Sequence, residues 1–123
     1  MVEAPTESAA QLYIISHLAW EREGHRTFDA QRALLLDILT QLLEHMQAEG
    51  EARLEYFLLG GQTILLDDIA HVRPDLLTSL VIYNAGGRLG VGPWYVQMDG
   101  LLADGEVLIR NLLLVILNII QLS

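Results

Sequence analysis

Three apolar runs, each followed by a stretch with helical features, constrain the fold of this chain most strongly. The runs lie at 12–16, 56–59 and 89–96. Short, continuous apolar runs of this kind are typical of strands in a parallel sheet that is covered on both faces. Because strands and helices alternate, the sequence predicts an α/β fold of three consecutive βα units with parallel strands.

The helices are predicted from apolar spacing and from end signals. Over 29–49, apolar residues recur at steps of three and four, and a glycine follows as a stop. A short apolar turn at 64–69 leads to Pro74, which suits the first position of a second helix. Two glycines at 86–87 end that helix. Asp104 is a suitable N-cap for a third helix.

The last helical segment, 112–122, is apolar on every side. A helix of this composition has to be buried all round, and three parallel strands leave two open edges. We therefore expect an incomplete (β/α) barrel, the first part of a larger one. It would span residues 12–123, after a flexible N-terminal segment at 1–11.

Charge and composition exclude several classes of function. The net charge of −9 argues against binding to nucleic acids or anionic membranes, whereas neutral sugars are compatible with it. The acidic, polar N-terminus is unlike a signal peptide. The 11 residues at 112–122 are too few for a membrane span, which needs about 20 apolar residues. The chain has no cysteine, and we expect it to be cytoplasmic.

Polar residues follow the first and third predicted strands. His17, Trp20 and a charged run at 21–23 come after the first strand, and Asp99 comes after the third. Because the carboxyl ends of parallel strands share one edge of a sheet, we expect these groups to meet there. Carboxylate and imidazole groups in one place indicate a hydrolytic or metal site. The alternative is a solvated charge run beside a hydrogen-bonded histidine.

Three ordered blocks of sequence resemble the family 38 glycoside hydrolases, the α-mannosidases. The blocks are HLAWEREGHRTF at 17–28, FLLGGQ at 57–62 and GPWYVQMDG at 92–100. The third is followed by DGE at 104–106 and RNL at 110–112. Together the blocks extend over nearly the whole chain. The resemblance is to the N-terminal part of the catalytic β/α barrel domain of that family.

The resemblance implies a retaining glycosidase that hydrolyses terminal α-mannosidic bonds in carbohydrate catabolism. Asp99 matches the family's nucleophile, which attacks the anomeric carbon and forms a covalent glycosyl-enzyme. A divalent metal, usually zinc, is implied as well, and Glu21 and Asp99 match two of its ligands. Trp94 and Tyr95 are the expected contacts for a mannoside or oligosaccharide substrate.

Several residues depart from the family pattern. The second histidine of the first block is Ala19 here, its aspartate is Glu21, and its sugar-stacking tryptophan is Gly24. The aspartate of the family's D-G-Q motif is Gly60. The family's distal histidine ligand and its general acid come from later segments. We therefore expect weakened metal binding and no mannosidase activity from this chain alone.

A second interpretation from another class stays open. The chain is then a non-catalytic α/β module that associates with a partner chain or with itself. Such an association would cover the open strand edges and the apolar last helix. A third interpretation is a degraded remnant with no selected function.

Overall fold

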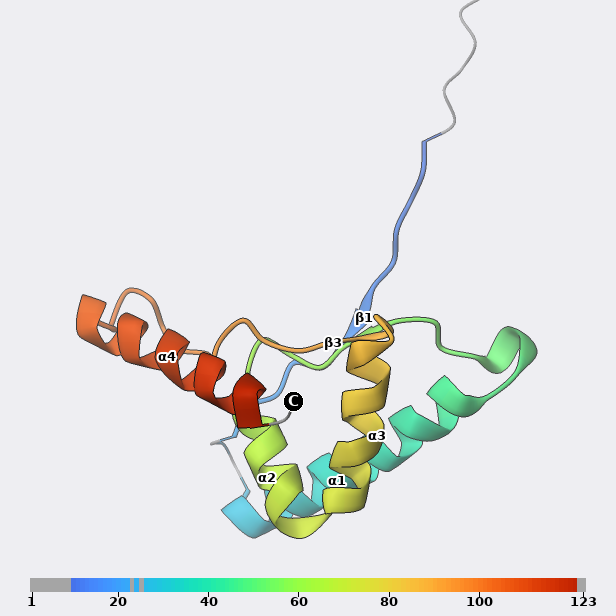
Figure 1. Cartoon of the computed structure of the whole chain (residues 1–123), viewed down its shortest axis with the longest axis horizontal. Coiled ribbons are helices and arrows are strands. Elements are labelled where there is room, and N and C mark those ends of the chain that lie inside the picture. Colours follow the sequence, from blue (N-terminus) through green and yellow to red (C-terminus); the bar gives the residue numbers. More distant parts are fainter. Residues whose placement is uncertain (1–9, 23, 25, 122–123) are drawn as a thin grey trace, which may run out of the picture.

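Three short parallel strands form an open sheet in the computed structural model, which describes residues 10–22, 24 and 26–121. The sheet order is β1-β2-β3, and Figure 1 shows α1, α2 and α3 on one side of the strands, with α4 apart from them. The predicted α/β fold with three parallel strands is thereby confirmed. The strands are β1 (Ser16–His17), β2 (Phe57–Leu58) and β3 (Leu89–Gly90), and the helices are α1 (Phe28–Gln47), α2 (Ile64–Val72), α3 (Pro74–Ala85) and α4 (Gly105–Gln121).

The first strand differs from the prediction. It begins at Ser16, and residues 12–15 before it are exposed and lead away from the body of the molecule (Figure 1). The reason is the hydrogen bonding of the backbone just before β2, the strand that pairs with β1. Ser16 pairs with Phe57, and just before Phe57 the backbone bonds elsewhere: the Leu54 amide donates to the carbonyl of His45 at 3.0 Å. No partner backbone therefore reaches residues 12–15, and their apolar side chains stay outside the core. Residues 1–9 of the predicted flexible segment lie outside the described residues.

The third strand is also shorter than the predicted run at 89–96. It ends at Gly90, and Pro93, which has no N–H to donate to a ladder, follows soon after. Backbone pairing then resumes as an isolated parallel bridge between Gln62 and Trp94. There the Trp94 amide donates to Gly61 at 2.9 Å, and the Thr63 amide donates to Trp94 at 2.8 Å. The apolar run is thus two pairing regions separated by a proline.

Helix α1 agrees with its prediction. Thr27 caps it, because its Oγ1 accepts a hydrogen bond of 3.3 Å from the Ala30 amide. The helix ends at Gln47, and a short 3-10 turn follows at Gly50–Ala52. Its buried side chains recur at helical spacing and form one side of the core. They are Leu35, Leu39, Leu42, Leu43 and Met46.

The predicted turn at 64–69 is a full helix, α2. Proline disfavours the helical conformation of the residue before it, and Arg73 has φ −139° and ψ 71°. Pro74 therefore ends α2 and begins α3 at the same point. Helix α3 stops at Ala85 and is followed by the predicted glycine pair, of which Gly87 has a positive φ of 71°.

The core lies between α1, α2, α3 and the strands. Its centre consists of side chains with almost no exposed surface, which come from α1, α2, α3 and the strand segments. These are Leu35, Leu39, Met46, Leu59, Leu65, Ile69, Leu80 and Leu89.

A buried carboxylate joins this core to the segment after β1. Asp68 on α2, with 6% of its side chain exposed, accepts two hydrogen bonds from Arg22, at 2.9 and 3.0 Å. It also accepts one from Arg32 of α1 at 3.3 Å. The two guanidinium groups lie 5.0 Å and 4.4 Å from the ring of Phe28. This cluster fixes the path of the chain between β1 and α1.

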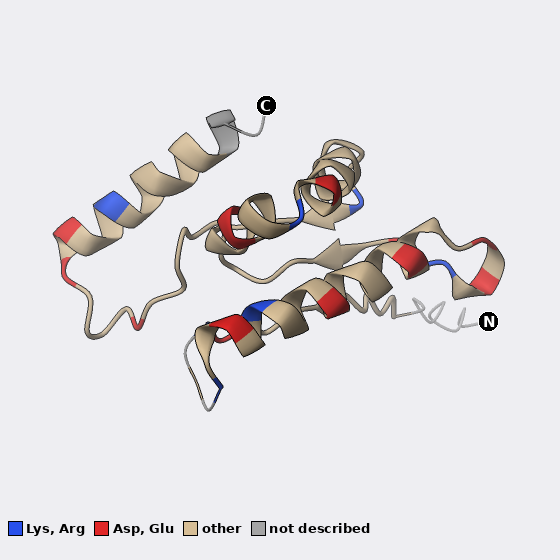
Figure 2. Cartoon of the chain, turned by 90° about the horizontal axis from the view of Figure 1, so that it is seen from below, with Lys and Arg blue, Asp and Glu red and all other residues tan. Residues whose placement is uncertain are grey.

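Helix α4 buries two asparagines, while most of its large apolar side chains face outward among the described residues. Asp104 caps it by accepting a 2.9 Å hydrogen bond from the Val107 amide, as predicted. Asn111, Val115 and Asn118 are its buried residues among those described. Its exposed large apolar residues are Val107, Ile109, Leu112, Leu113, Leu114, Ile116 and Leu117. Figure 2 shows α4 apart from the other helices, with charge only near its N-terminal end. None of the described helices is both long and apolar enough to cross a membrane.

The Asp68 cluster makes a prediction for stability. Asp68→Ala leaves two part-buried guanidinium groups without their carboxylate, and we expect a loss of about 3 kcal/mol in the free energy of unfolding. The matched control is Asp75→Ala, which removes an exposed ion pair with Arg73 and should change little. Urea unfolding followed by circular dichroism measures both. Equal effects would show that the Asp68 cluster is not a structural anchor.

Candidate active site

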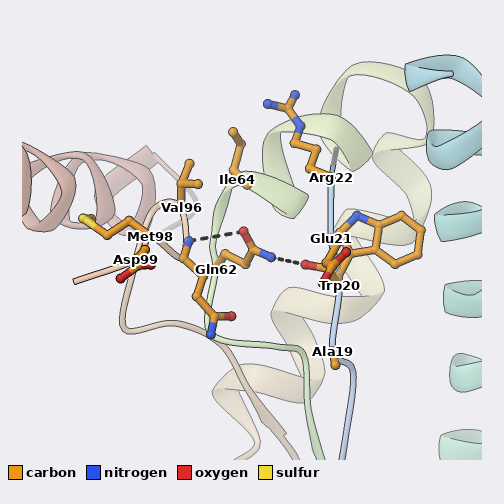
Figure 3. Close-up of a pocket in the computed structure, with 10 residues that line it drawn as sticks. Ala19, Trp20, Glu21, Arg22, Gln62, Ile64, Val96, Met98 and Asp99 are labelled. Carbon is orange, nitrogen blue, oxygen red and sulfur yellow. Dashed lines mark hydrogen bonds between the residues drawn. The ribbon is translucent and has the colours of Figure 1, made fainter. Parts of the chain in front are cut away.

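A cleft of about 710 Å³ lies where the chain leaves the carboxyl ends of the three strands. Figure 3 shows the side chains around it. They come from the segment after β1, from the turn between β2 and α2, and from the segment after β3. The lining residues are Ala19, Trp20, Glu21, Arg22, Gln62, Ile64, Val96, Gln97, Met98 and Asp99.

Gln62 lies in the middle of this arrangement and joins the other two segments (Figure 3). Its Nε2 donates a hydrogen bond to the carbonyl of Trp20. Its Oε1 accepts one of 3.3 Å from the Gln97 amide. The side chain is buried, with 5% of the residue exposed. Gln62 therefore connects the segments that follow all three strands.

Glu21 and Asp99 both line the cleft, as the parallel arrangement predicts. They come from opposite sides of it, with Gln62 between them (Figure 3). The Glu21 carbonyl accepts a 2.8 Å hydrogen bond from Gln31 of α1, which holds its backbone while the side chain is exposed. Trp20 beside it is buried in the core.

Asp99 begins a tight turn. Its Oδ1 accepts a 2.9 Å hydrogen bond from the Leu101 amide, and its carbonyl accepts from Leu102 and Ala103 at 3.1 and 3.0 Å. One carboxylate oxygen thus orients the side chain. The residue is exposed at the cleft, so a ligand in the cleft can reach the carboxylate.

The aromatic residues Trp94 and Tyr95 are not among the residues that line this cleft. The Tyr95 hydroxyl donates a 2.8 Å hydrogen bond to Asp67, and its amide donates to Asn111 Oδ1 at 2.6 Å. Burial, and then the hydrogen bond to Asp67, raise the pKa of the Tyr95 phenol above its ordinary value of 10.0. Tyr95 therefore joins the β3 segment to α2.

Asn111 and Asn118 hold α4 to this site. Asn111 accepts from the amides of Tyr95 and Val96 and donates to the Val96 carbonyl at 2.7 Å. Asn118 donates to both oxygens of Asp67, at 3.1 and 3.2 Å. Through these contacts, the polar side of α4 fixes the backbone that carries Asp99.

Gly60, at the position of the family's aspartate, has a φ of 55°. A Cβ placed there would lie 3.0 Å from the Leu18 carbonyl oxygen. A side chain at this position would be strained, and it would press on the segment that leads to Ala19 and Glu21. Glycine at 60 therefore allows the segments after β1 and β2 to approach closely.

The cleft does not present a set of ligands that fits zinc. Structural and catalytic zinc ions are held mostly by imidazole and thiolate groups. Within the described ranges, no three His, Asp or Glu side chains are grouped to hold a metal. The cleft supplies two carboxylates, and Ala19 has no donor atom in its side chain. His17 is an exposed residue of β1; Glu23 and His25 lie outside the described residues.

Sequence reasoning placed Arg22 at this edge within the charged run at 21–23, but it did not assign a role in the site to Gln62 or Asn111. Gln62 follows two glycines directly after an apolar strand, which is a position where a side chain can turn back across a sheet edge. Asn111 and Asn118 stand within a mostly apolar helix. Polar residues in such a helix were the available signal for inward contacts.

The comparisons with known proteins agree with this arrangement. The chain is 38% identical over 101 residues to a protein of Halalkalibacterium halodurans named "Putative mannosylglycerate hydrolase", with 82% of this chain and 11% of that protein aligned. An α-mannosidase from Enterococcus faecalis V583 superposes with a TM-score of 0.78 at 29% identity. A glycosyl hydrolase family 38 protein from Enterococcus faecalis superposes with a TM-score of 0.74 at 29% identity. Each of the two superpositions covers 89% of this chain and 12% of the solved protein chain. No protein-family model matches the chain.

These similarities in sequence and fold relate the chain to glycoside hydrolases. The resemblance of this chain to family 38, predicted from its three sequence blocks, is confirmed. The chain corresponds to 11–12% of the length of these relatives.

Tyr95 makes a prediction for high pH. Its folded pKa is raised above the unfolded value, so its stabilising contribution is complete below the unfolded pKa of about 10 and is lost as pH rises through the folded pKa. All seven basic residues are arginine, so no lysine titrates in this range. Tyr95→Phe should reduce the fall in stability between about pH 9 and about pH 11, as measured by urea unfolding. Tyr13→Phe, at an exposed position, should leave this fall in stability unchanged. An equally large fall in Tyr95→Phe as in the natural chain would show that Tyr95 does not cause it.

Proposed function

We propose that this chain is the N-terminal part of the catalytic domain of an α-mannosidase-like glycoside hydrolase. Its three βα units would form part of a (β/α) barrel, in which active sites lie at the carboxyl ends of the strands. The observation that carries this proposal is the cleft at that edge, lined by Glu21 and Asp99. The similarity to family 38 proteins supports it along most of the chain.

Within this proposal, Asp99 is the nucleophile. One of its carboxylate oxygens bonds to the anomeric carbon while the glycosidic C–O bond breaks, and the leaving oxygen takes a proton from a general acid. Water then breaks the sugar–aspartate bond. The Leu101 amide, which donates to Oδ1, would leave Oδ2 to attack. The acid would come from another segment of the catalytic domain, as the family resemblance implies.

The substrate proposed by resemblance is a mannoside or oligosaccharide with a terminal α-mannosidic bond. Trp94 and Tyr95 are proposed to contact the sugar. In this chain they lie beside the cleft, with Tyr95 bonded to Asp67. This role requires the binding site to extend past the cleft along the segment after β3.

The metal of the family would be held by Glu21 and Asp99 in this chain. That pair does not fit a tight zinc site, and Ala19 stands where the family has an imidazole. We therefore propose that this chain alone neither binds zinc tightly nor hydrolyses mannosides.

A calorimetric zinc titration tests the assignment of the site. We expect affinity in the natural chain weaker than about micromolar. Ala19→His with Glu21→Asp restores the donors of the family and should tighten binding by about tenfold or more. Adding Asp99→Ala should remove that gain.

Two outcomes would contradict this prediction. No gain in the double variant would show that positions 19, 21 and 99 do not share a metal site. Turnover of an activated mannoside by the natural chain, abolished in Asp99→Asn, would show that the chain is active without those donors.

The second candidate function is an α/β module that associates with itself or a partner chain. The observation that favours it is α4, whose outward side is apolar while Asn111 and Asn118 face inward. Among the described residues of this helix, seven large apolar side chains are exposed, whereas a monomer surface usually exposes such side chains singly. Its two charged residues, Glu106 and Arg110, neutralise each other at 2.7 Å.

Self-association through α4 is testable by size-exclusion chromatography with light scattering. The natural chain should elute above its monomer mass of 13.7 kDa. Leu113→Glu with Leu117→Glu places two charges on the outward side and should shift the protein towards the monomer. Ile82→Glu, at an exposed apolar position on α3, is the matched control. A sharp monomer peak for the natural chain would contradict the prediction.

A further inference from the structure

The two carboxylates of the cleft are carried by segments that, over their described residues, make no direct hydrogen bond to one another. Glu21 directly follows Trp20, and Asp99 comes two residues after Gln97. Within the part of the chain that the structure describes, Gln62 is the only side chain with hydrogen bonds to both segments. Gln62 thus bridges the two segments that carry Glu21 and Asp99.

The chemistry of a carboxamide suits this task. It offers a donor at one atom and an acceptor at the other. Gln62 uses its N–H to reach the Trp20 carbonyl and its oxygen to receive the Gln97 N–H (Figure 3). Both protein groups are backbone atoms, so the contacts fix the chain path itself. Because Gln62 is 5% exposed, water does not easily replace these bonds.

The backbone of Gln62 is itself held firmly. The residues on either side pair with the segment after β3, through the Trp94 amide to Gly61 and the Thr63 amide to Trp94. The next residue, Ile64, donates to the Tyr95 carbonyl at 3.0 Å and begins α2. The side chain thus extends from a fixed point towards the segment after β1, whose main link to α2 is otherwise Arg22 with Asp68.

We propose that Gln62 is a positioning residue that sets the separation of the Glu21 and Asp99 carboxylates across the cleft. The importance of that separation rests on the proposed function. The geometric role of Gln62 does not.

Distance measurement by electron paramagnetic resonance tests this role directly. The chain has no cysteine, so Ala19→Cys with Gly100→Cys accepts two spin labels at defined positions and leaves both carboxylates in place. A Cβ at Gly100 would meet no atom within 4 Å. Excess unlabelled chain keeps each measured distance within one molecule. We expect a narrow distance distribution in this labelled parent.

Gln62→Leu keeps the volume of the side chain and removes both hydrogen bonds. We expect it to widen the distribution by about twofold or more, or to shift its mean. Gln97→Ala is the matched control: it removes a side chain that lines the cleft but keeps the backbone N–H that bonds Gln62. It should leave the distribution narrow.

Gln62→Glu distinguishes a positioning role that depends on the hydrogen bonds of residue 62 from a role that depends only on the packing of its side chain. At about pH 8 an ionised carboxylate cannot donate to the Trp20 carbonyl, so the distribution should be wide. At about pH 5 a buried carboxyl group takes up a proton, regains a donor and an acceptor, and should restore the narrow distribution. The labelled parent, measured at both pH values, should not change.

The outcomes are distinguishable. A narrow, unshifted distribution in Gln62→Leu would overturn the proposal, because the backbone pairing alone would then set the spacing. If Gln62→Leu does not fold, Gln62→Glu decides: a wide distribution at both pH values would overturn the positioning role. These distances report neither metal nor sugar binding, so failure of the zinc titration leaves this test unaffected.

Discussion

Parallel pairing of three very short strands is the constraint on which the site depends. Each strand has only two residues, so the ladder contributes few hydrogen bonds. It nevertheless aligns the chain so that three separate segments leave the sheet at one edge. The helices α1, α2 and α3 supply the buried apolar surface that makes this alignment stable. Polar contacts then fix the segments beyond the strands.

These polar contacts form a continuous set around the cleft. Asp68 holds the segment after β1 to α1 and α2. Gln62 joins the same segment to the one after β3. Asn111 fixes the next part of that segment from α4. Each contact uses a buried side chain that bonds backbone or ion-pair partners far away in sequence. The cleft is therefore built by tertiary hydrogen bonds more than by secondary structure.

The relation to family 38 glycoside hydrolases and the departures from the family pattern concern different residues. The solved relatives cover 89% of this chain, so most of the pairing and of the core belongs to the shared fold. Of the positions expected to differ from the family pattern, Ala19 lines the cleft, and Gly60 lies close to the backbone of Leu18. The scaffold places Glu21 and Asp99 at one cleft, and Ala19, which also lines it, has a methyl side chain with no donor atom.

Local sequence signals determined the helices and the edge at which chemistry is located. Thr27, Pro74 and Asp104 mark helix starts because capping and proline geometry act within a few residues. Parallel βα order was enough to predict that Glu21 and Asp99 share a cleft. The tertiary structure decided the strand lengths, the full helix at α2, the turning of Tyr95 towards Asp67 and the bridging role of Gln62. The contacts of Tyr95 and Gln62 depend on partners that are 28 and 42 residues away in the sequence, and no local pattern records such contacts.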